Sequence, residues 1–199
     1  MYSSDKIGIV ILAAGSSSRL GEPKQLLQYG SQNLLQVAIN AAVNSTADPV
    51  VVVLGANAEQ VSREIDKSKI NVIINKEWEE GMASSVRNGL NELLFISPST
   101  EAVIFMVCDQ PHVSSDLIND LVGTQRQTGK LIVTCNYGEA IGPPALFHKS
   151  LFKELMELKG DVGARKIIQK HSDDVATILF AEGKIDIDTK EDYDALRNS

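Results

Sequence analysis

Short, continuous apolar runs recur along this chain and predict strands that are buried on both faces. Residues 7–12 form the first run, whose length and β-branched content are typical of such a strand. A second run, residues 50–54, follows a proline and ends at a glycine, and a third, residues 101–109, ends in an acid. Three further strands are predicted at 70–74, 130–134 and 175–180. Continuous apolar strands favour a parallel sheet that is covered on both faces.

The segments between these runs have helical periodicity. In residues 33–44 the apolar positions recur at helical spacing, and Asn33 is a suitable cap for that helix. Further helices are predicted at 57–67, from about 81 to 97, and at 114–127, 151–158 and 160–168. Because strands and helices alternate, we expect an α/β fold: a single domain, residues 1–199, with a mainly parallel, twisted sheet.

Residues 138–148 depart from this pattern, because glycine and proline precede a short apolar tail. Proline cannot donate a hydrogen bond to a sheet ladder and is found mainly on edge strands. This segment is therefore predicted to be a loop that leads into an edge strand.

Composition narrows the class of protein. The 199 residues are 43% hydrophobic, which is enough for one domain with a sizeable core. A formal net charge of -7 argues against a general nucleic-acid binder, which needs a surplus of cations. Cys108 and Cys135 have no C-x-x-C spacing, so buried free thiols in a reducing, cytoplasmic compartment are expected. No stretch approaches the ~18 uninterrupted apolar residues of a membrane span.

Residues 12–28, which read L-A-A-G-S-S-S-R-L-G-E-P-K-Q-L-L-Q, follow the first predicted strand. Small residues at 13–15 let a ligand approach the backbone, and three serines supply hydroxyl and N–H donors. Arg19 and Lys24 add two cations, which suits a triphosphate. The spacing matches neither the phosphate loop of ATPases nor the dinucleotide fingerprint. A flexible surface loop with two solvated charges is the alternative.

Two other segments carry candidate chemistry. Gly81, Ser84 and Ser85 lie where a helix is predicted to begin, so they can contact a base or a ribose, or can simply cap that helix. Asp109 ends a predicted central strand and precedes Gln110. Ligands of open α/β sheets gather beyond the carboxyl ends of the strands, so this acid is placed to hold a divalent metal, or merely caps a turn.

Taken together, these segments resemble the motifs of nucleotidyltransferases that act on molybdenum cofactor. The loop matches L-A-A-G-x-S-x-R-(M/L)-G-x-P-K-x-L, and C-D-Q-P resembles the family's D-Q-P motif, whose Asp binds Mg²⁺. G-M-A-S-S-V-R-N-G-L resembles the form found in the cytidylyltransferases of this family. The resemblance implies a Rossmann-like, three-layer nucleotidyltransferase fold. It also implies that the nucleotide is bound by Leu12, Ala13, Ala14, Gly15, Ser16, Arg19, Lys24, Gly81, Ser84, Ser85 and Asp109.

Two later motifs of the same family imply the acceptor side, and a third implies a second metal ligand. A G-x-P-x-L-F segment contains Gly142 and Pro144, and G-D-x-G-A-R contains Asp161, Gly163 and Arg165. These five residues are the candidates for binding the second substrate, although Arg165 is equally compatible with a solvated position on a capped helix. D-I-D-T near the C-terminus implies a second Mg²⁺ ligand, for which we favour Asp188 over Asp186.

The implied enzyme transfers CMP from CTP to the phosphate of molybdopterin or molybdenum cofactor and releases pyrophosphate. Arg19, Lys24 and Asp109 are the expected catalytic residues, and Mg²⁺ the expected cofactor. Transient contact with a molybdoenzyme is expected, and neither nucleic acid nor membrane is an expected partner. Family members often carry an Arg where this chain has Ala140 and Ile141, so the acceptor stays open. A guanylyltransferase, a sugar-phosphate nucleotidyltransferase and a non-catalytic accessory protein for a molybdoenzyme remain alternatives.

Overall fold

A seven-stranded sheet organises the protein in a computed structural model that describes residues 6–18, 20–185, 187 and 189–197. The strands are arranged in the order β5-β4-β1-β6-β8-β7-β9. Their bounds are β1 Lys6–Ala13, β4 Val50–Leu54, β5 Asn71–Ile74, β6 Thr100–Val107, β7 Ile132–Asn136, β8 Ile141–His148 and β9 Val175–Leu179. Strand β1 pairs in parallel with β4 and with β6, β4 pairs in parallel with β5, and β7 pairs in parallel with β9. Strand β8 runs antiparallel to both β6 and β7. The expected α/β fold with a mainly parallel sheet is confirmed.

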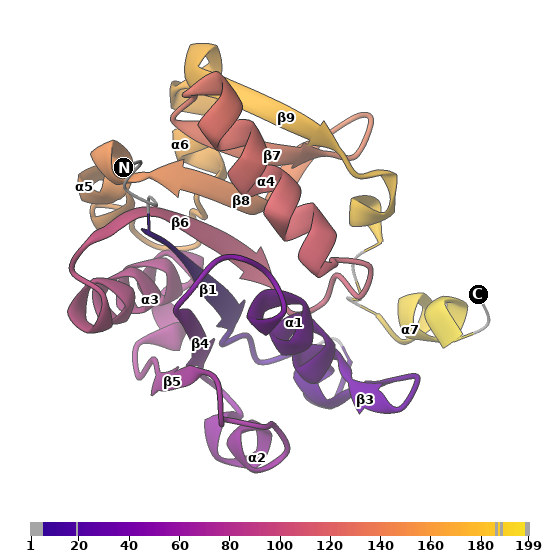
Figure 1. Ribbon diagram of the computed structural model, residues 1–199. Coiled ribbons are helices and arrows are strands. Elements are labelled where there is room, and N and C mark those ends of the chain that lie inside the picture. The colour runs from indigo at the N-terminus through magenta and orange to yellow at the C-terminus, as the bar shows by residue number, and fades with distance from the viewer. Residues whose placement is uncertain (1–5, 19, 186, 188, 198–199) are drawn as a thin grey trace.

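Helices cover both faces of the sheet and give the fold three layers (Figure 1). On one face lie α1 (Leu34–Val43), α2 (Ala58–Arg63) and α4 (Ser115–Thr128). On the other lie α3 (Met82–Ile96), α5 (Phe152–Met156) and α6 (Arg165–Lys170). Along β1, for example, Ile9 and Ile11 pack into the first core while Val10 packs into the second. Successive side chains of a strand face opposite layers, which is why the strands read as continuous apolar runs.

Short elements complete the chain. The 3-10 turns are η1 (Lys24–Leu26), η2 (Trp78–Glu80), η3 (Lys149–Leu151), η4 (Ser172–Asp174) and η5 (Ala181–Lys184). A small hairpin of β2 (Gln28–Tyr29) and β3 (Gln32–Asn33) lies near the C-terminal helix α7 (Lys190–Arg197), where Tyr193 Oη donates to the Gln28 carbonyl (2.9 Å). No helix among the described residues is both long and apolar enough to cross a membrane.

Helix starts follow the local chemistry of the sequence. The Asn33 side chain accepts a hydrogen bond from the Gln36 amide (2.8 Å), so the predicted cap of α1 is confirmed. Ser114 caps α4 in the same way, and Gly129 ends that helix in the left-handed region at φ 65°. The helix predicted over 57–67 is shorter, because α2 ends at Arg63.

The predicted edge strand is wrong: β8 lies inside the sheet, between β6 and β7. The register with β7 passes from Thr134 opposite Ala145 to Cys135 opposite Gly142, so Pro143 and Pro144 fall at an irregularity in the ladder. Pairing with β6 begins only at Ala145. A bulge removes the need for the two missing N–H donors, so an interior strand tolerates the prolines.

The contact between α3 and the sheet predicts a stability effect. A Cβ atom added at Gly89 would lie 2.3 Å from Val10 Cγ1 and 2.9 Å from Val53 Cγ2, and both valines are fully buried. We expect Gly89→Ala to lower the free energy of unfolding by about 1–3 kcal/mol, because the helix must move away from the sheet. Urea unfolding followed by circular dichroism measures the change.

Gly123→Ala is the matched control for that measurement. Gly123 is inside α4, and apart from its chain neighbours and the backbone of its own helix, a Cβ there would meet no atom of the described residues within 4 Å. Alanine in an open helical position is expected to stabilise the protein by roughly 0.5–1 kcal/mol. Equal effects of the two substitutions would contradict the close packing of α3.

Candidate active site

Two adjacent cavities open beyond the carboxyl ends of β1 and β6. The first has a volume of about 370 Å³, and its wall is formed by the end of β1, the following loop, η1, η2, the start of α3 and the end of β6. The second has a volume of about 590 Å³ and extends beneath β8 and α6. Lys24 and Asp109 line both cavities, together with Leu12, Met82 and Val107. Two binding spaces therefore meet at one pair of opposite charges.

Lys24 and Asp109 are the charged centre of the site. Lys24 Nζ lies 2.5 Å from Asp109 Oδ2, and the side chains are 18% and 14% exposed, respectively. The lysine also lies 3.5 Å from the Ile187 carbonyl, which belongs to the C-terminal segment. Partial burial strengthens such a pair relative to one in open water. The structure thus brings together two candidates that are 85 residues apart in the sequence.

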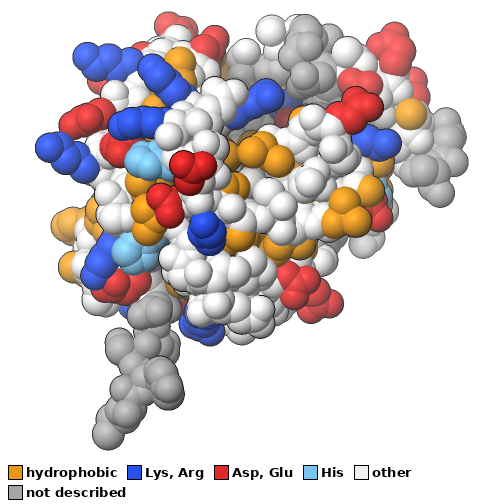
Figure 2. Space-filling view, turned by 90° about the horizontal axis from the view of Figure 1, so that it is seen from above, with side chains coloured by type: hydrophobic (Ala, Val, Ile, Leu, Met, Phe, Trp, Pro, Cys, Tyr) orange, Lys and Arg blue, Asp and Glu red, His pale blue; other side chains and the backbone are white. Residues whose placement is uncertain are grey.

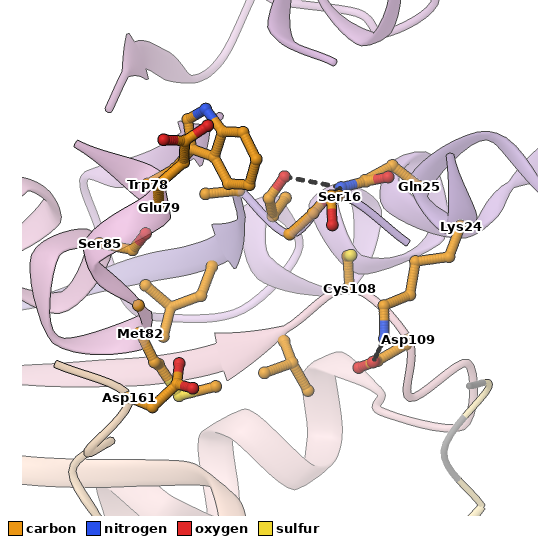
Figure 3. A pocket seen from close by; sticks show the side chains of 16 residues that line it. Ser16, Lys24, Gln25, Trp78, Glu79, Met82, Ser85, Cys108, Asp109 and Asp161 are labelled. Atoms are coloured by element: carbon orange, nitrogen blue, oxygen red, sulfur yellow. Dashed lines mark hydrogen bonds and ion pairs between the residues drawn. The ribbon is translucent and has the colours of Figure 1, made fainter. Parts of the chain in front are cut away.

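The loop after β1 lies along the first cavity. Leu12, Ala13, Ala14, Gly15 and Ser16 all line it. Ser17 has a positive φ of 55°, and its hydroxyl accepts a hydrogen bond from the Lys24 backbone amide (2.9 Å). This bond closes the loop and directs η1 back toward the cavity. Figure 3 shows Lys24 and Gln25 of η1 at the wall of that cavity. Arg19 lies outside the described residues.

The start of α3 forms the opposite wall, and here the two candidate serines differ. Ser85 lines the first cavity, whereas Ser84 is fully buried and its hydroxyl donates to the Gly81 carbonyl (2.9 Å). The side-chain amide of Asn75 donates a hydrogen bond to each of the two serine hydroxyls, at 2.7 Å to Ser84 and 3.0 Å to Ser85. Gly81 is required for its backbone: it has φ 113°, and an added Cβ would lie 2.6 Å from Asp161 Oδ1.

Hydrogen bonds of Glu80 and Arg87 connect this wall to the loop that precedes α6. Arg87 forms a two-pronged ion pair with Glu80, at 2.6 and 2.9 Å, and also donates to the Leu158 carbonyl (2.6 Å). The Gly160 amide donates to Glu80 (3.3 Å). The hydrogen bond from Arg87, and then that from Gly160, lower the pKa of the Glu80 carboxyl below its usual value. One wall of the first cavity is thereby tied to a loop that serves both cavities.

The candidate acceptor residues are divided between the cavities. Gly142, Gly163 and Arg165 line the second cavity, and Asp161 lines the first. Pro144 is buried within β8, and its neighbour Pro143 lines the second cavity instead. Apart from the charged pair and two cations at 165 and 184, the second cavity is mostly apolar, with walls that include Phe105, Tyr137 and Phe147.

Cys108 lies beside Asp109 on the wall of the first cavity. Burial, followed by the nearby negative charge of Asp109, raises the pKa of the thiol to about 12, although Lys24 opposes this shift. The thiol is therefore neutral at physiological pH and is not a nucleophile, since only the thiolate attacks. The site chemistry rests on its charged pair and on backbone groups.

Asp109 provides oxygen atoms suited to a hard divalent cation such as Mg²⁺ or Mn²⁺. Within residues 6–18, 20–185, 187 and 189–197, no group of three or more acidic, histidine or cysteine side chains forms a complete metal site. Asp186 and Asp188, the candidates for a second ligand, lie outside the described residues. Of the described residues, Ile187 stands between them in the sequence, and its carbonyl oxygen lies 3.5 Å from Lys24 Nζ.

Several residues that line the cavities are not predicted by any motif of the sequence. Trp78, Glu79 and Met82 line the first cavity around the start of α3, and Figure 3 shows them on the side opposite Lys24. Trp78 is the sole tryptophan and lies three positions before Gly81, which was a usable signal. Gln110, Tyr137 and Lys184 line the second cavity, but they come from separate segments with no shared pattern.

The sequence is similar to a known family and to several named proteins. The sequence model of a family described as MobA-like NTP transferase domain matches residues 9–175. Purine catabolism protein PucB of Bacillus subtilis (strain 168) is 29% identical over 96% of this chain and 95% of its own length. Molybdenum cofactor cytidylyltransferase of Escherichia coli (strain K12) is 24% identical over 94% of this chain and 93% of its own. Proteins named molybdenum cofactor guanylyltransferase also match.

Solved structures share the architecture. The crystal structure of Rv0371c from Mycobacterium tuberculosis H37Rv superimposes with a TM-score of 0.87 and 29% identity, covering 99% of this chain and 100% of that one. A structure of Rv0371c in complex with manganese has a TM-score of 0.80 and 26% identity, covering 98% of this chain and 99% of that one.

Proposed function

This chain belongs to the family of MobA-like NTP transferase domains and is a nucleotidyltransferase of that family, and we propose that it transfers CMP from CTP to the phosphate of molybdopterin or molybdenum cofactor. The observation that carries this proposal is the meeting of two cavities at Lys24 and Asp109. A transferase must hold a donor and an acceptor with their reacting atoms in contact, and two adjacent spaces with one shared charged centre meet that need.

The first cavity is the proposed donor site. Its small-residue loop, Ala13 to Ser16, suits a triphosphate, and Lys24 supplies a compact positive charge at the end nearest the second cavity. The base would then lie toward Trp78, whose indole can stack on it, with the carboxylates of Glu79 and Asp161 nearby. Carboxylates accept hydrogen bonds from an exocyclic amino group such as that of cytosine.

The second cavity is the proposed acceptor site. Its apolar and aromatic walls suit a flat heterocycle, while Arg165 and Lys184 offer cations to a phosphate. These two cations line the cavity that also contains Ala140 and Ile141, and in this proposal they take the place of an arginine at those positions. This arrangement supports a phosphorylated, partly apolar acceptor of the molybdopterin type.

In the proposed reaction, an oxygen of the acceptor phosphate forms a bond to the α-phosphorus of CTP. The bond between that phosphorus and the oxygen bridging to the β-phosphate breaks, and pyrophosphate leaves with the electron pair. A phosphate monoester is largely ionised near neutral pH, so no side chain has to remove a proton. Lys24 and, as proposed, Arg19 stabilise the charge on the leaving pyrophosphate.

Asp109, together with Asp188, would hold the Mg²⁺ that we propose as cofactor. A divalent cation bound there neutralises phosphate charge and helps to align the reacting groups. We also propose that the reaction takes place in the cytoplasm, where Cys108 and Cys135, both buried and free, stay reduced. The product would then pass to a molybdoenzyme by transient contact.

The surface is in keeping with a small-molecule enzyme. Figure 2 shows acidic and basic side chains interspersed on one face of the molecule. Binding to nucleic acid draws on continuous basic surfaces, so neither this face nor the net charge of -7 favours such a partner.

The nucleotide preference tests this proposal. With purified protein, Mg²⁺ and molybdopterin, we expect pyrophosphate release from CTP to exceed that from GTP or UTP by at least about tenfold. UTP lacks an amino group that could donate hydrogen bonds to the carboxylates, and the start of α3 resembles the motif of the cytidylyltransferases and not that of the guanylyltransferases. Each NTP is supplied in turn and pyrophosphate is measured. A preference for GTP would make the protein a guanylyltransferase, and release with a sugar phosphate but not with molybdopterin would replace the acceptor. Absence of turnover with every combination would leave the accessory-protein alternative.

A further inference from the structure

Gln25 lies next to Lys24 and is almost completely buried, with 1% of its surface exposed. Its side-chain amide nitrogen donates two hydrogen bonds to the loop after β1, one to the Ala13 carbonyl (2.8 Å) and one to the Gly15 carbonyl (3.0 Å). In Figure 3 its amide points back toward Ser16, while Lys24 points toward Asp109. Lys24 and Gln25 are neighbours in η1, but their side chains contact different parts of the wall of the first cavity.

The orientation of this amide is fixed by its partners. A carbonyl oxygen can only accept, so the NH₂ group must face both loop carbonyls, and a flipped amide would place oxygen against oxygen. The other amide atom, Oε1, is buried and has no hydrogen-bond partner in the described part of the chain. An unsatisfied buried acceptor is costly. The favourable polar interactions of the buried Gln25 side chain are thus the two hydrogen bonds that it donates to the loop.

Those bonds determine which way the loop amides point. In a trans peptide the C=O and N–H groups point in opposite directions. Because the carbonyls of Ala13 and Gly15 are drawn inward to Gln25, the N–H groups of the same two peptides, which belong to Ala14 and Ser16, point away from it. Ala14 and Ser16 both line the first cavity. Successive N–H groups that face a concave surface bind anions.

We propose that Gln25 is a positioning residue that orients the N–H groups of Ala14 and Ser16 toward the triphosphate of the nucleotide. This inference rests on the proposed function, because it takes the first cavity as the nucleotide site. It concerns the phosphates and not the base, whose end of the cavity is formed by Trp78 and the start of α3. The distinction between phosphate and base makes the inference testable.

The test compares Gln25→Met and Gln25→Glu with the unchanged protein. Methionine keeps the shape but donates nothing, and a glutamate would place a carboxylate against two carbonyl oxygens. Trp78 is the sole tryptophan and lines the cavity, so its fluorescence reports binding of CTP and of cytidine. We expect Gln25→Met to weaken CTP binding by on the order of tenfold and Gln25→Glu by more, with cytidine binding unchanged in both.

Gln36→Met is the matched control. The side-chain amide of Gln36 also makes two hydrogen bonds, because it donates to Asn40 Oδ1 (3.0 Å) and accepts from the backbone amide of Asp66 (2.9 Å). Gln36 belongs to α1, however, and lines neither cavity. Its loss should leave both affinities unchanged. Thermal unfolding of all three variants ensures that binding is measured on folded protein.

A second measurement needs no variant. In the unchanged protein, the amide proton resonances of Ala14 and Ser16 should shift downfield on addition of CTP and stay in place on addition of cytidine. Normal CTP affinity in Gln25→Met, equal losses for CTP and cytidine, or unmoved amide resonances would overturn the inference. Failure of the unchanged protein to bind any NTP would instead overturn the proposed function.

Discussion

Lys24→Ala is expected to lower the turnover of nucleotidyl transfer by on the order of 10² or more, the loss typical of removing one fixed electrostatic donor. Lys24 Nζ lies at the junction of the two cavities, 2.5 Å from Asp109 Oδ2. That junction is where the bond to the leaving pyrophosphate would break, so a positive charge there stabilises the transition state more than the bound substrate. Pyrophosphate release with CTP and molybdopterin measures the effect.

Two further variants make the measurement specific. Lys69→Ala removes an exposed lysine that lines neither cavity and should leave turnover unchanged. Lys24→Arg keeps the charge but replaces a compact ammonium by a planar fork, so we expect only partial activity. Near-normal turnover of Lys24→Ala would show that the loop after β1 does not bind the phosphates in the way proposed.

Asp109→Asn should abolish most turnover while the fold stays intact. Asparagine keeps the shape of the side chain and can still accept a hydrogen bond from Lys24, but a hard cation prefers carboxylate oxygen to a neutral amide. The loss should exceed about 10², since a bound metal contributes several kcal/mol to stabilising transition-state charge. Thermal stability should change little, because Asp109 lies beyond the end of β6 and belongs to none of the hydrophobic core clusters of the described residues.

Metal titration completes this test. Raising Mg²⁺ or Mn²⁺ should restore part of the activity of Asp109→Asn if metal binding is the defect. Asp188→Asn is expected to behave like Asp109→Asn, and Asp186→Asn is the matched control two residues away. If the Asp186 variant is inactive and the Asp188 variant is active, Asp186 and not Asp188 is the second metal ligand. Full activity of Asp109→Asn would contradict the proposed role of the metal.

The strands of this protein could be predicted closely from the sequence. The run at 50–54 corresponds residue for residue to β4, because every one of its side chains faces a layer of helices and must be apolar. Local chemistry likewise determined the caps at Asn33 and Ser114, since each uses its own side chain on an amide three residues ahead. The ends of elements were less certain, as the short helix α2 shows.

The candidate site was predictable where it depends on strand ends. The loop after β1 and the acid after β6 both follow the carboxyl ends of strands, where the ligands of open α/β sheets gather, and Lys24 and Asp109 do form an ion pair there. Ser84 and Ser85 could not be told apart, since they are adjacent in sequence. Only the packing of α3 decided that Ser85 lines the cavity while Ser84, which is fully buried, does not.

The sequence by itself determined most of the strands and helices, the caps at Asn33 and Ser114 and the loop that follows β1, because hydrophobic periodicity, capping and turn formation act over a few residues. Only the tertiary structure decided that β8 is an interior strand, that Gln25 holds the loop carbonyls, and that Tyr137 and Lys184 line one cavity with Arg165. These relations depend on the order in which the strands pair and on how the helices pack over them. Such choices are settled by the burial of the whole core, so no single segment carries a signal for them.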